Sequence, residues 1–203
     1  AIHKIPNIDK PLIADMSSVI LSEPIDVTKF SLIYAGAQKN IGPAGLTLVI
    51  IEKEFMQKDN SDLPNLLRYS QHARSESMLN TPPTFAWYMA GKVFKWIKKS
   101  GGLKFFKEQN DAKASMLYSY IDNSSFYNNY VNFENRSKMN IVFNLSDDAL
   151  DSKFISESDE KGLLSLKGHR SVGGMRASIY NAMPLEGVKE LIKFMDYFES
   201  KYG

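Results

Sequence analysis

Residues 31–51 read Ser-Leu-Ile-Tyr-Ala-Gly-Ala-Gln-Lys-Asn-Ile-Gly-Pro-Ala-Gly-Leu-Thr-Leu-Val-Ile-Ile, and they indicate the fold class. Two apolar runs, Ser31–Ala35 and Leu46–Ile51, predict buried strands. Pro43 and Gly45 mark the loop between them. The second run is almost entirely apolar, which is typical of a strand in a parallel or mixed sheet covered on both faces. The segment therefore predicts part of an α/β sheet.

A shorter apolar run precedes this segment. Pro11–Ala14 ends at Asp15, and we expect a buried strand whose last residue carries a carboxylate into a site. The nearby hydroxyls of Ser17 and Ser18 are candidates to approach a phosphate in the same place.

Two helices are expected in the middle of the chain. The sequence Asn-Thr-Pro-Pro-Thr at 80–84 is typical of a helix start, where Asn or Thr caps free N–H groups and Pro is tolerated. A second helix is expected over about Leu103–Ile121. Trp87 and Trp96 are interpreted as packing residues. Apolar positions spaced for one face of the first helix are Phe85, Met89, Val93, Phe94, Trp96 and Ile97.

The remainder of the chain predicts a small α+β unit. Its elements are a strand over 138–145, a helix over 151–167 stopped by Gly168, a loop and strand over 171–181, and a closing helix over 184–201. We place the domain boundary near residue 105, which gives domains of 1–105 and 106–203.

Composition excludes several classes of protein. The chain has 203 residues, 43% of them hydrophobic and 24% charged, which excludes disorder as the main state. The longest apolar run has six residues, against roughly 20 for a membrane-spanning helix. A net charge of +2 without charge blocks makes nucleic acid a weak hypothesis. The absence of cysteine fits a reducing compartment, and we expect the cytoplasm. No metal site is expected, because His3 and His72 have no partner at a recognisable spacing.

Lys39 is the first candidate for chemistry. It lies among small and apolar residues between two predicted core strands, where an ammonium group is costly unless it is used. Desolvation lowers a lysine pKa and supplies the neutral amine that imine chemistry requires. The residues alone leave two interpretations open, a Schiff-base lysine and an exposed loop lysine.

Asp15 gives Lys39 a possible partner. A carboxylate about 4 Å from a pyridinium nitrogen contributes roughly 4 kcal/mol at an effective dielectric near 20, or about three pKa units. It would keep the ring protonated, as pyridoxal phosphate requires to act as an electron sink. Asp15 and Lys39 are thus the minimal pair for this cofactor. A cap or turn role for Asp15 also remains open.

Three segments resemble the phosphoserine aminotransferase family, in the same order along nearly the whole chain. They are Gly-Ala-Gln-Lys-Asn-Ile-Gly-Pro-Ala-Gly at 36–45, Asn-Thr-Pro-Pro-Thr-Phe at 80–85, and Gly-His-Arg-Ser-Val-Gly-Gly-Met-Arg-Ala-Ser-Ile-Tyr-Asn-Ala-Met at 168–183. Members are class V, fold type I pyridoxal-phosphate enzymes and homodimers. The resemblance implies the C-terminal part of their large domain, a mixed sheet flanked by helices, followed by a small C-terminal α+β domain.

The resemblance also implies roles for the cofactor-binding residues. Lys39 forms the imine with pyridoxal 5'-phosphate, Asp15 partners the pyridine nitrogen, and Gln38 contacts the cofactor phosphate. Asn80 and Thr81 reach the phosphate of the cofactor held by the other subunit, so the two active sites of a homodimer would be shared. A helix start suits this role, because its free N–H groups favour an anion.

The glycine-rich segment at 168–176 carries the residues that the resemblance assigns to substrate binding. The resemblance implies that His169 and Arg170 face the substrate phosphate and that Arg176 holds the α-carboxylate. Arginine binds such anions through bidentate, charge-assisted hydrogen bonds. Gly173 and Gly174 allow backbone conformations that other residues would forbid, which helps to direct Arg176 into the cleft. From the residues alone, two solvated arginines are the alternative.

The implied reaction is a ping-pong transamination of 3-phosphohydroxypyruvate with L-glutamate, which gives phosphoserine and 2-oxoglutarate. It belongs to serine biosynthesis and, in many bacteria, to pyridoxine biosynthesis. Another class V enzyme, of the serine–glyoxylate type or a desulfurase, would share Asp15 and Lys39 without requiring the His169-Arg170 pair.

The resemblance places Ala1 inside the large domain. We therefore expect the chain to be the C-terminal portion of a longer enzyme, inactive by itself. An isolated portion that folds or dimerises without catalysis is the remaining alternative.

Overall fold

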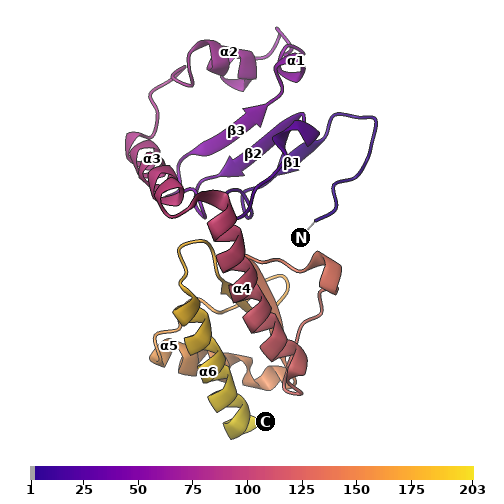
Figure 1. The fold of residues 1–203 in the computed structure, drawn as a ribbon, viewed down its shortest axis with the longest axis vertical. Coiled ribbons are helices and arrows are strands. Elements are labelled where there is room, and N and C mark those ends of the chain that lie inside the picture. The colour runs from indigo at the N-terminus through magenta and orange to yellow at the C-terminus, as the bar shows by residue number, and fades with distance from the viewer. Residues whose placement is uncertain (1–2) are drawn as a thin grey trace. The chain divides into compact units, whose positions relative to one another are not determined.

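The computed structural model describes residues 3–203 (Figure 1). Contacts within the chain divide it into two compact units. The first is Pro6–Phe105, and the second is Phe106–Gly203 with the segment that ends at Ile5. None of the described helices is long and apolar enough to cross a membrane.

The first unit contains a three-stranded mixed sheet in the order β1-β2-β3. Its strands are β1 (Ile13–Asp15), β2 (Leu32–Gly36) and β3 (Thr47–Ile51). Strands β1 and β2 are parallel, with Asp15 opposite Tyr34, and β3 is antiparallel to β2. The three strands expected from the apolar runs are therefore present, each within two residues of its predicted bounds. The expectation that the first is buried is wrong, because Ile13 and Asp15 of β1 are exposed.

One face of this sheet is covered by the segments around it. Ile33 and Ala35 of β2 pack with Ile41, Ile20 and Ala90 in one buried cluster. The helical elements of this unit are η1 (Val27–Lys29), α1 (Lys53–Met56), η2 (Asn65–Leu67), α2 (Tyr69–Arg74) and α3 (Thr84–Lys99). The short helices α1 and α2 lie between β3 and α3, where no element was expected.

Helix α3 differs from its prediction at its start. It begins at Thr84, its N-cap is Pro83, and no side chain caps it. The expectation that Asn80 or Thr81 caps the helix is wrong. Pro82 and Pro83 precede the first turn, and they have no N–H for a side chain of Asn80 or Thr81 to cap.

The buried face of helix α3 matches the expected one only in part: Ile97 is buried as expected, whereas Phe85, Phe94 and Trp96 are exposed. Its buried residues are Ala86, Ala90 and Ile97. Trp87 and Trp96 are 41% and 42% exposed, so the expectation that they are packing residues is wrong within this chain. Small side chains let a helix approach a sheet closely, which leaves the aromatic residues on the outer surface.

The second unit contains an antiparallel sheet in the order β4-β5-β6. Its strands are β4 (Tyr127–Asn128), β5 (Asn140–Leu145) and β6 (Met175–Ser178). Burial along β5 alternates residue by residue, as in a strand with one covered face. The helical elements are α4 (Gly102–Asn123), η3 (Phe133–Asn135), η4 (Asp148–Leu150), α5 (Asp151–Glu160) and α6 (Leu185–Tyr202).

Aromatic rings fill the core of the second unit. Phe154 of α5 is fully buried, and its ring lies 5.0 Å from those of Phe194 and Phe198 on α6. It also lies 5.9 Å from Phe143 on β5, at a steep angle. Such edge-to-face contacts stabilise aromatic clusters and join both helices to the sheet.

Helix α5 is shorter than predicted. It ends at Glu160 rather than continuing to Lys167. Gly162 has φ +78°, a conformation that favours glycine and ends helices. The chain then runs back to the sheet, where Lys167 pairs with Met175 in an isolated bridge. The apolar residues after Gly162 continued the helical pattern, which explains the error.

Candidate active site

The parallel pairing of β1 and β2 creates the first part of the site. Because the strands run in the same direction, both C-terminal ends lie at one edge of the sheet. Asp15 ends β1, and the segment that holds Gln38 and Lys39 follows β2. Ligands of α/β proteins bind outside such carboxyl ends. The structure therefore brings Asp15, Gln38 and Lys39 to one place.

Asp15 is held as an anion. The backbone N–H of Ser17 donates to its Oδ1 at 2.8 Å. Hydrogen bonds from the Ser17 hydroxyl and N–H lower the pKa of Asp15, and the Tyr34 hydroxyl and the charge of Lys39 lower it further. The Ser17 hydroxyl also accepts from the Gly36 N–H at 2.9 Å, which ties this turn to the end of β2.

Lys39 is half-buried in a tight turn. Its Nζ donates to the Ser18 hydroxyl at 2.5 Å. The neighbouring Asn40 is buried and donates to the Ile20 carbonyl at 3.0 Å, and the Gly42 N–H donates to Ala37 at 2.8 Å. These contacts fix the backbone on both sides of Lys39, so its amine points toward the segment that follows Asp15.

Gln38 folds back over the end of β2. A Cβ atom on Gly36 would lie 2.6 Å from the Gln38 Oε1 atom. Only glycine therefore allows the amide to lie against the backbone here. This places a polar amide beside Gly36, at the end of β2.

Asn80 and Thr81 lie in the loop that leads into α3, and both are exposed. The Asn80 side chain donates to the Thr81 carbonyl at 3.1 Å. Among the described residues, neither forms a hydrogen bond with Asp15, Gln38 or Lys39. The single chain thus leaves this pair outside the group formed by the other three.

His169 and Arg170 lie on an exposed loop of the second unit. The loop is closed by its own backbone, because the Gly168 N–H donates to the Gly174 carbonyl at 2.8 Å. A Cβ atom on Gly168 would lie only 2.0 Å from the Gly173 oxygen. Inside the loop, His169 Nδ1 and the Ser171 hydroxyl are 2.6 Å apart. The loop presents a histidine and an arginine side by side to solvent.

Arg176 lies on β6 directly after this loop and pairs with Val142 on β5. Its side chain is half-buried, and its Nε atom is buried with no hydrogen-bond partner among the described residues. A buried, unpaired donor of a charged group costs free energy. The arrangement therefore favours an anionic acceptor brought by a ligand. In residues 3–203, no group of His, Asp or Glu side chains is arranged to hold a metal ion.

Comparison with known proteins identifies the family. A sequence model described as "Aminotransferase class-V" matches residues 2–191. The chain belongs to this family. The phosphoserine aminotransferase of Acinetobacter baylyi is 56% identical over 199 residues, which are 98% of this chain and 55% of that protein. The chain thus spans about half the length of the curated relatives it matches.

Solved structures give the same result for this class-V chain. A phosphoserine aminotransferase from Bacillus circulans subsp. alkalophilus matches with a TM-score of 0.93 and 47% identity, over 96% of this chain and 54% of that one. The pyridoxal-phosphate-bound enzyme from Trichomonas vaginalis matches with a TM-score of 0.91 and 41% identity, over 96% of this chain and 56% of that one. The α/β fold with a mixed sheet and flanking helices is therefore confirmed.

The sequence did not reveal two contacts of this class-V site. Ser18 contacts Lys39, and Tyr34 contacts Asp15. Tyr34 lies beside Asp15 only because of the parallel register, which pairs residues far apart in the sequence. An apolar run shows that a strand exists but not which residue faces which, so the tyrosine had no signal of its own.

The closed loop gives a stability prediction. Gly168→Ala should lower the free energy of unfolding by about 1–3 kcal/mol, because its Cβ collides with two carbonyl oxygens of the same loop. Urea unfolding of the full-length protein measures the effect. Gly91→Ala is the matched control, since it lies within α3 with nothing within 4 Å of the added carbon. It should be neutral or stabilising by up to about 1 kcal/mol. Equal losses in both variants would contradict the steric argument.

Proposed function

We propose that this chain is the C-terminal portion of a pyridoxal-phosphate-dependent phosphoserine:2-oxoglutarate aminotransferase. The observation that carries the proposal is the pairing of Asp15 with Lys39. A carboxylate held as an anion and a half-buried amine come from neighbouring parallel strands to one edge of the sheet. Curated relatives with that name, 56% identical over almost this whole chain, support the specific activity.

The residues present fit pyridoxal phosphate. Asp15 is exposed and already negative, as a partner of a protonated pyridine nitrogen must be. Lys39 supplies the amine, and Gln38 supplies an amide for the phosphate group. When bound, the cofactor provides an electron sink for charge that develops at the substrate α-carbon. Asp15 holds the proton on the ring nitrogen, through a charge that its own hydrogen bonds from Ser17 maintain.

Lys39 has two roles in this scheme. Its Nζ atom would hold the cofactor, since it is the amine nearest Asp15 in this group of residues. When free, the same amine would take the proton from the substrate α-carbon as a general base. The Ser18 hydroxyl, 2.5 Å from Nζ, is placed to orient that amine.

The second unit binds the ends of the substrate. Arg176 takes the α-carboxylate, which gives its buried Nε an acceptor. His169 and Arg170 take the phosphate of phosphoserine or 3-phosphohydroxypyruvate. L-glutamate and 2-oxoglutarate share the α-carboxylate contact with Arg176 in the other half of the cycle. The reaction serves serine biosynthesis, and a phosphorylated hydroxythreonine analogue would connect it to pyridoxine biosynthesis. Doubly charged phosphates do not cross membranes unaided, so we place the reaction in the cytoplasm.

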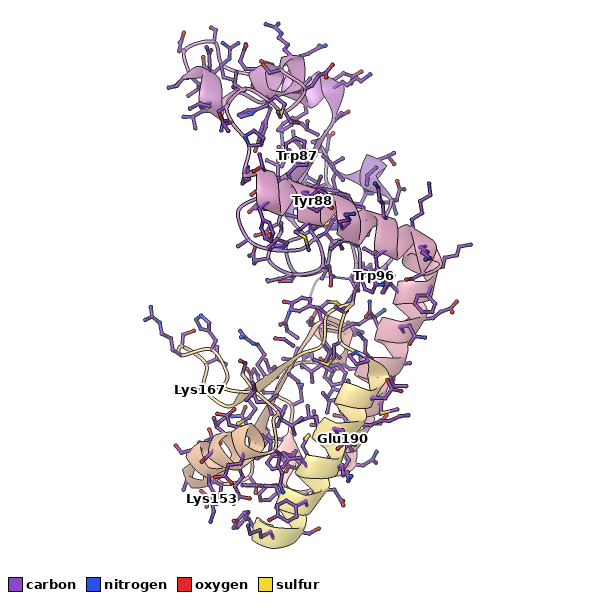
Figure 2. All side chains as sticks on the ribbon, turned by 90° about the vertical axis from the view of Figure 1, so that its left-hand side faces the viewer. Trp87, Tyr88, Trp96, Lys153, Lys167 and Glu190 are labelled. Carbon is purple, nitrogen blue, oxygen red and sulfur yellow. The ribbon has the colours of Figure 1, made fainter. Side chains whose placement is uncertain are left out.

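The working form is a homodimer with shared active sites. Figure 2 shows Trp87, Tyr88 and Trp96 on α3, and these aromatic side chains are 41%, 61% and 42% exposed in the single chain. Such exposed aromatic surface is typical of an interface. Asn80 and Thr81 precede this helix, so a second copy packed on α3 brings them near its own cofactor phosphate.

The two units support the proposed domains of 1–105 and 106–203. Pro6–Phe105 is the C-terminal part of the large cofactor-binding domain, and the segment from Phe106 onward is the small α+β domain. The separate cores, one around Ile33 and one around Phe154, support this division.

The central role of Lys39 is directly testable. Lys39→Ala in the full-length enzyme should lower kcat by at least about a thousandfold. Borohydride treatment should no longer add the mass of the cofactor to the protein. The exposed Lys29 in the same unit provides the control, and Lys29→Ala should retain both properties. Retained activity together with retained cofactor mass in Lys39→Ala would exclude this lysine.

The two anion-binding roles predict different kinetics. Arg176→Lys should raise KM for L-glutamate and for phosphoserine by about tenfold or more. The reason is that lysine lacks the planar guanidinium group, which binds a carboxylate through two hydrogen bonds. His169→Ala should raise KM for phosphoserine while leaving L-glutamate within about twofold. Steady-state rates of both half-reactions measure these effects. Equal losses for both substrates in His169→Ala would exclude the phosphate role and favour another class V activity.

The aromatic surface of α3 predicts an assembly defect. The double substitution Phe85→Ser and Tyr88→Ser removes two of the most exposed rings and should weaken the dimer at least about tenfold, as measured by sedimentation. Leu164→Ser, at an exposed leucine of the second unit, is the control and should leave the dimer intact. An unchanged dimer in the double variant would place the interface elsewhere.

A further inference from the structure

Helix α4 buries a lysine that the proposed reaction does not use. Lys113 is 1% exposed, although lysines are almost never fully buried unless paired. Its Nζ donates to three backbone carbonyls, those of Ile179 at 3.0 Å, Tyr180 at 2.8 Å and Met183 at 3.0 Å. An ammonium group has three donors, so each proton has its own acceptor.

The three acceptors belong to one turn of the chain. The segment 179–183 leads from the end of β6 at Ser178 to the start of α6 at Leu185. Reversal of the chain here points three carbonyl oxygens toward one position, where a single ammonium group donates to all of them. The Ile179 N–H also donates to the Met139 carbonyl at 2.9 Å. Ile179 therefore extends the β5–β6 ladder by one residue and is held by Lys113 from the other side.

A second side chain of α4 holds the same turn. Asn110 lies three residues before Lys113, on the same face of the helix. Its Nδ2 atom donates to the Asn181 side chain at 2.9 Å, in a buried hydrogen bond. Two positions of one rigid helix thus fix three consecutive residues of the turn and Met183.

The ammonium group of Lys113 has a cost that its hydrogen bonds offset. Burial lowers the pKa of Lys113 to about 8, and among the described residues no carboxylate pairs with it. The three carbonyl acceptors compensate for the desolvation of the cation. What the ammonium provides is position, because three hydrogen bonds from one nitrogen fix three backbone points relative to α4.

The position it fixes is that of the strand carrying Arg176. Strand β6 has only four residues, and Arg176 lies three residues before Ile179. We propose that Lys113 is a positioning residue for Arg176, acting through the turn 179–183 to hold β6 where the guanidinium meets the substrate carboxylate. This inference rests on the carboxylate role proposed above for Arg176.

The test uses Lys113→Met in the full-length holoenzyme, which keeps the length of the side chain and removes the donors. KM for L-glutamate and for phosphoserine should both rise about tenfold, and kcat should stay within about threefold. The Kd of glutarate, a non-reacting dicarboxylate, should rise by a similar factor. Cofactor retention, measured by absorbance, should be unchanged. Lys104→Met, at an exposed lysine of α4, is the control and should change none of these values.

A double-mutant cycle separates positioning from general damage. If Lys113 acts through Arg176, then Lys113→Met should add less than about twofold to KM in an Arg176→Lys background. Should the Met variant fail to fold, Lys113→Gln keeps two donors and should give an intermediate rise in KM. An unchanged KM in a folded variant, or full additivity with Arg176→Lys, would overturn the inference. If Arg176→Lys itself leaves KM unchanged, the proposed function fails instead. Hydrogen exchange at the amides of 176–183 should still be faster in Lys113→Met, because that readout does not depend on the reaction.

Discussion

The parallel pairing of β1 with β2 is the constraint on which the first half of the site depends. It sets Asp15 opposite Tyr34 and directs both following segments to the same edge of the sheet. Side chains alternate across a strand, so a slip of one residue would turn Asp15 to the opposite face. Ser17 secures this register, because it is bonded both to Asp15 and to the N–H of Gly36 at the end of β2.

Three cationic side chains differ in how fully their donors are hydrogen-bonded within the protein. This difference distinguishes a side chain that stabilises the fold from one that binds a ligand. Lys113 is buried and has three acceptors, so its bonding capacity is used within the protein. Lys39 is half-buried and bonded to a single hydroxyl, which leaves donors for a ligand. Arg176 has a buried Nε with no partner among the described residues. Since buried polar groups are normally satisfied, the degree of satisfaction distinguishes a residue that holds the fold from one that awaits a ligand.

The sequence predicted those features that depend on local pattern. The strands around 31–35 and 46–51 follow from apolar runs, and the position of Asp15 at a strand end follows from the same signal. Features that depend on long-range contacts were missed or wrong. Helix α3 buries Ala86, Ala90 and Ile97 rather than its aromatic residues, because packing against the rest of the unit decides which face is covered. The end of α5 depends on the conformation of Gly162. The three hydrogen bonds of Lys113 join residues far apart in the chain.

The loop between Gly168 and Gly174 has a consequence for how specificity can change. Its ends are bonded to each other through the backbone, so the residues between them, His169 to Gly173, contribute little to holding the sheet together. Lys39, the proposed general base, lies in a different unit with a separate core. Under the proposed function, substitutions within the loop would alter which anion is recognised without changing Lys39. A new substrate preference would then need only a few local changes, and the proposed reaction type would be preserved.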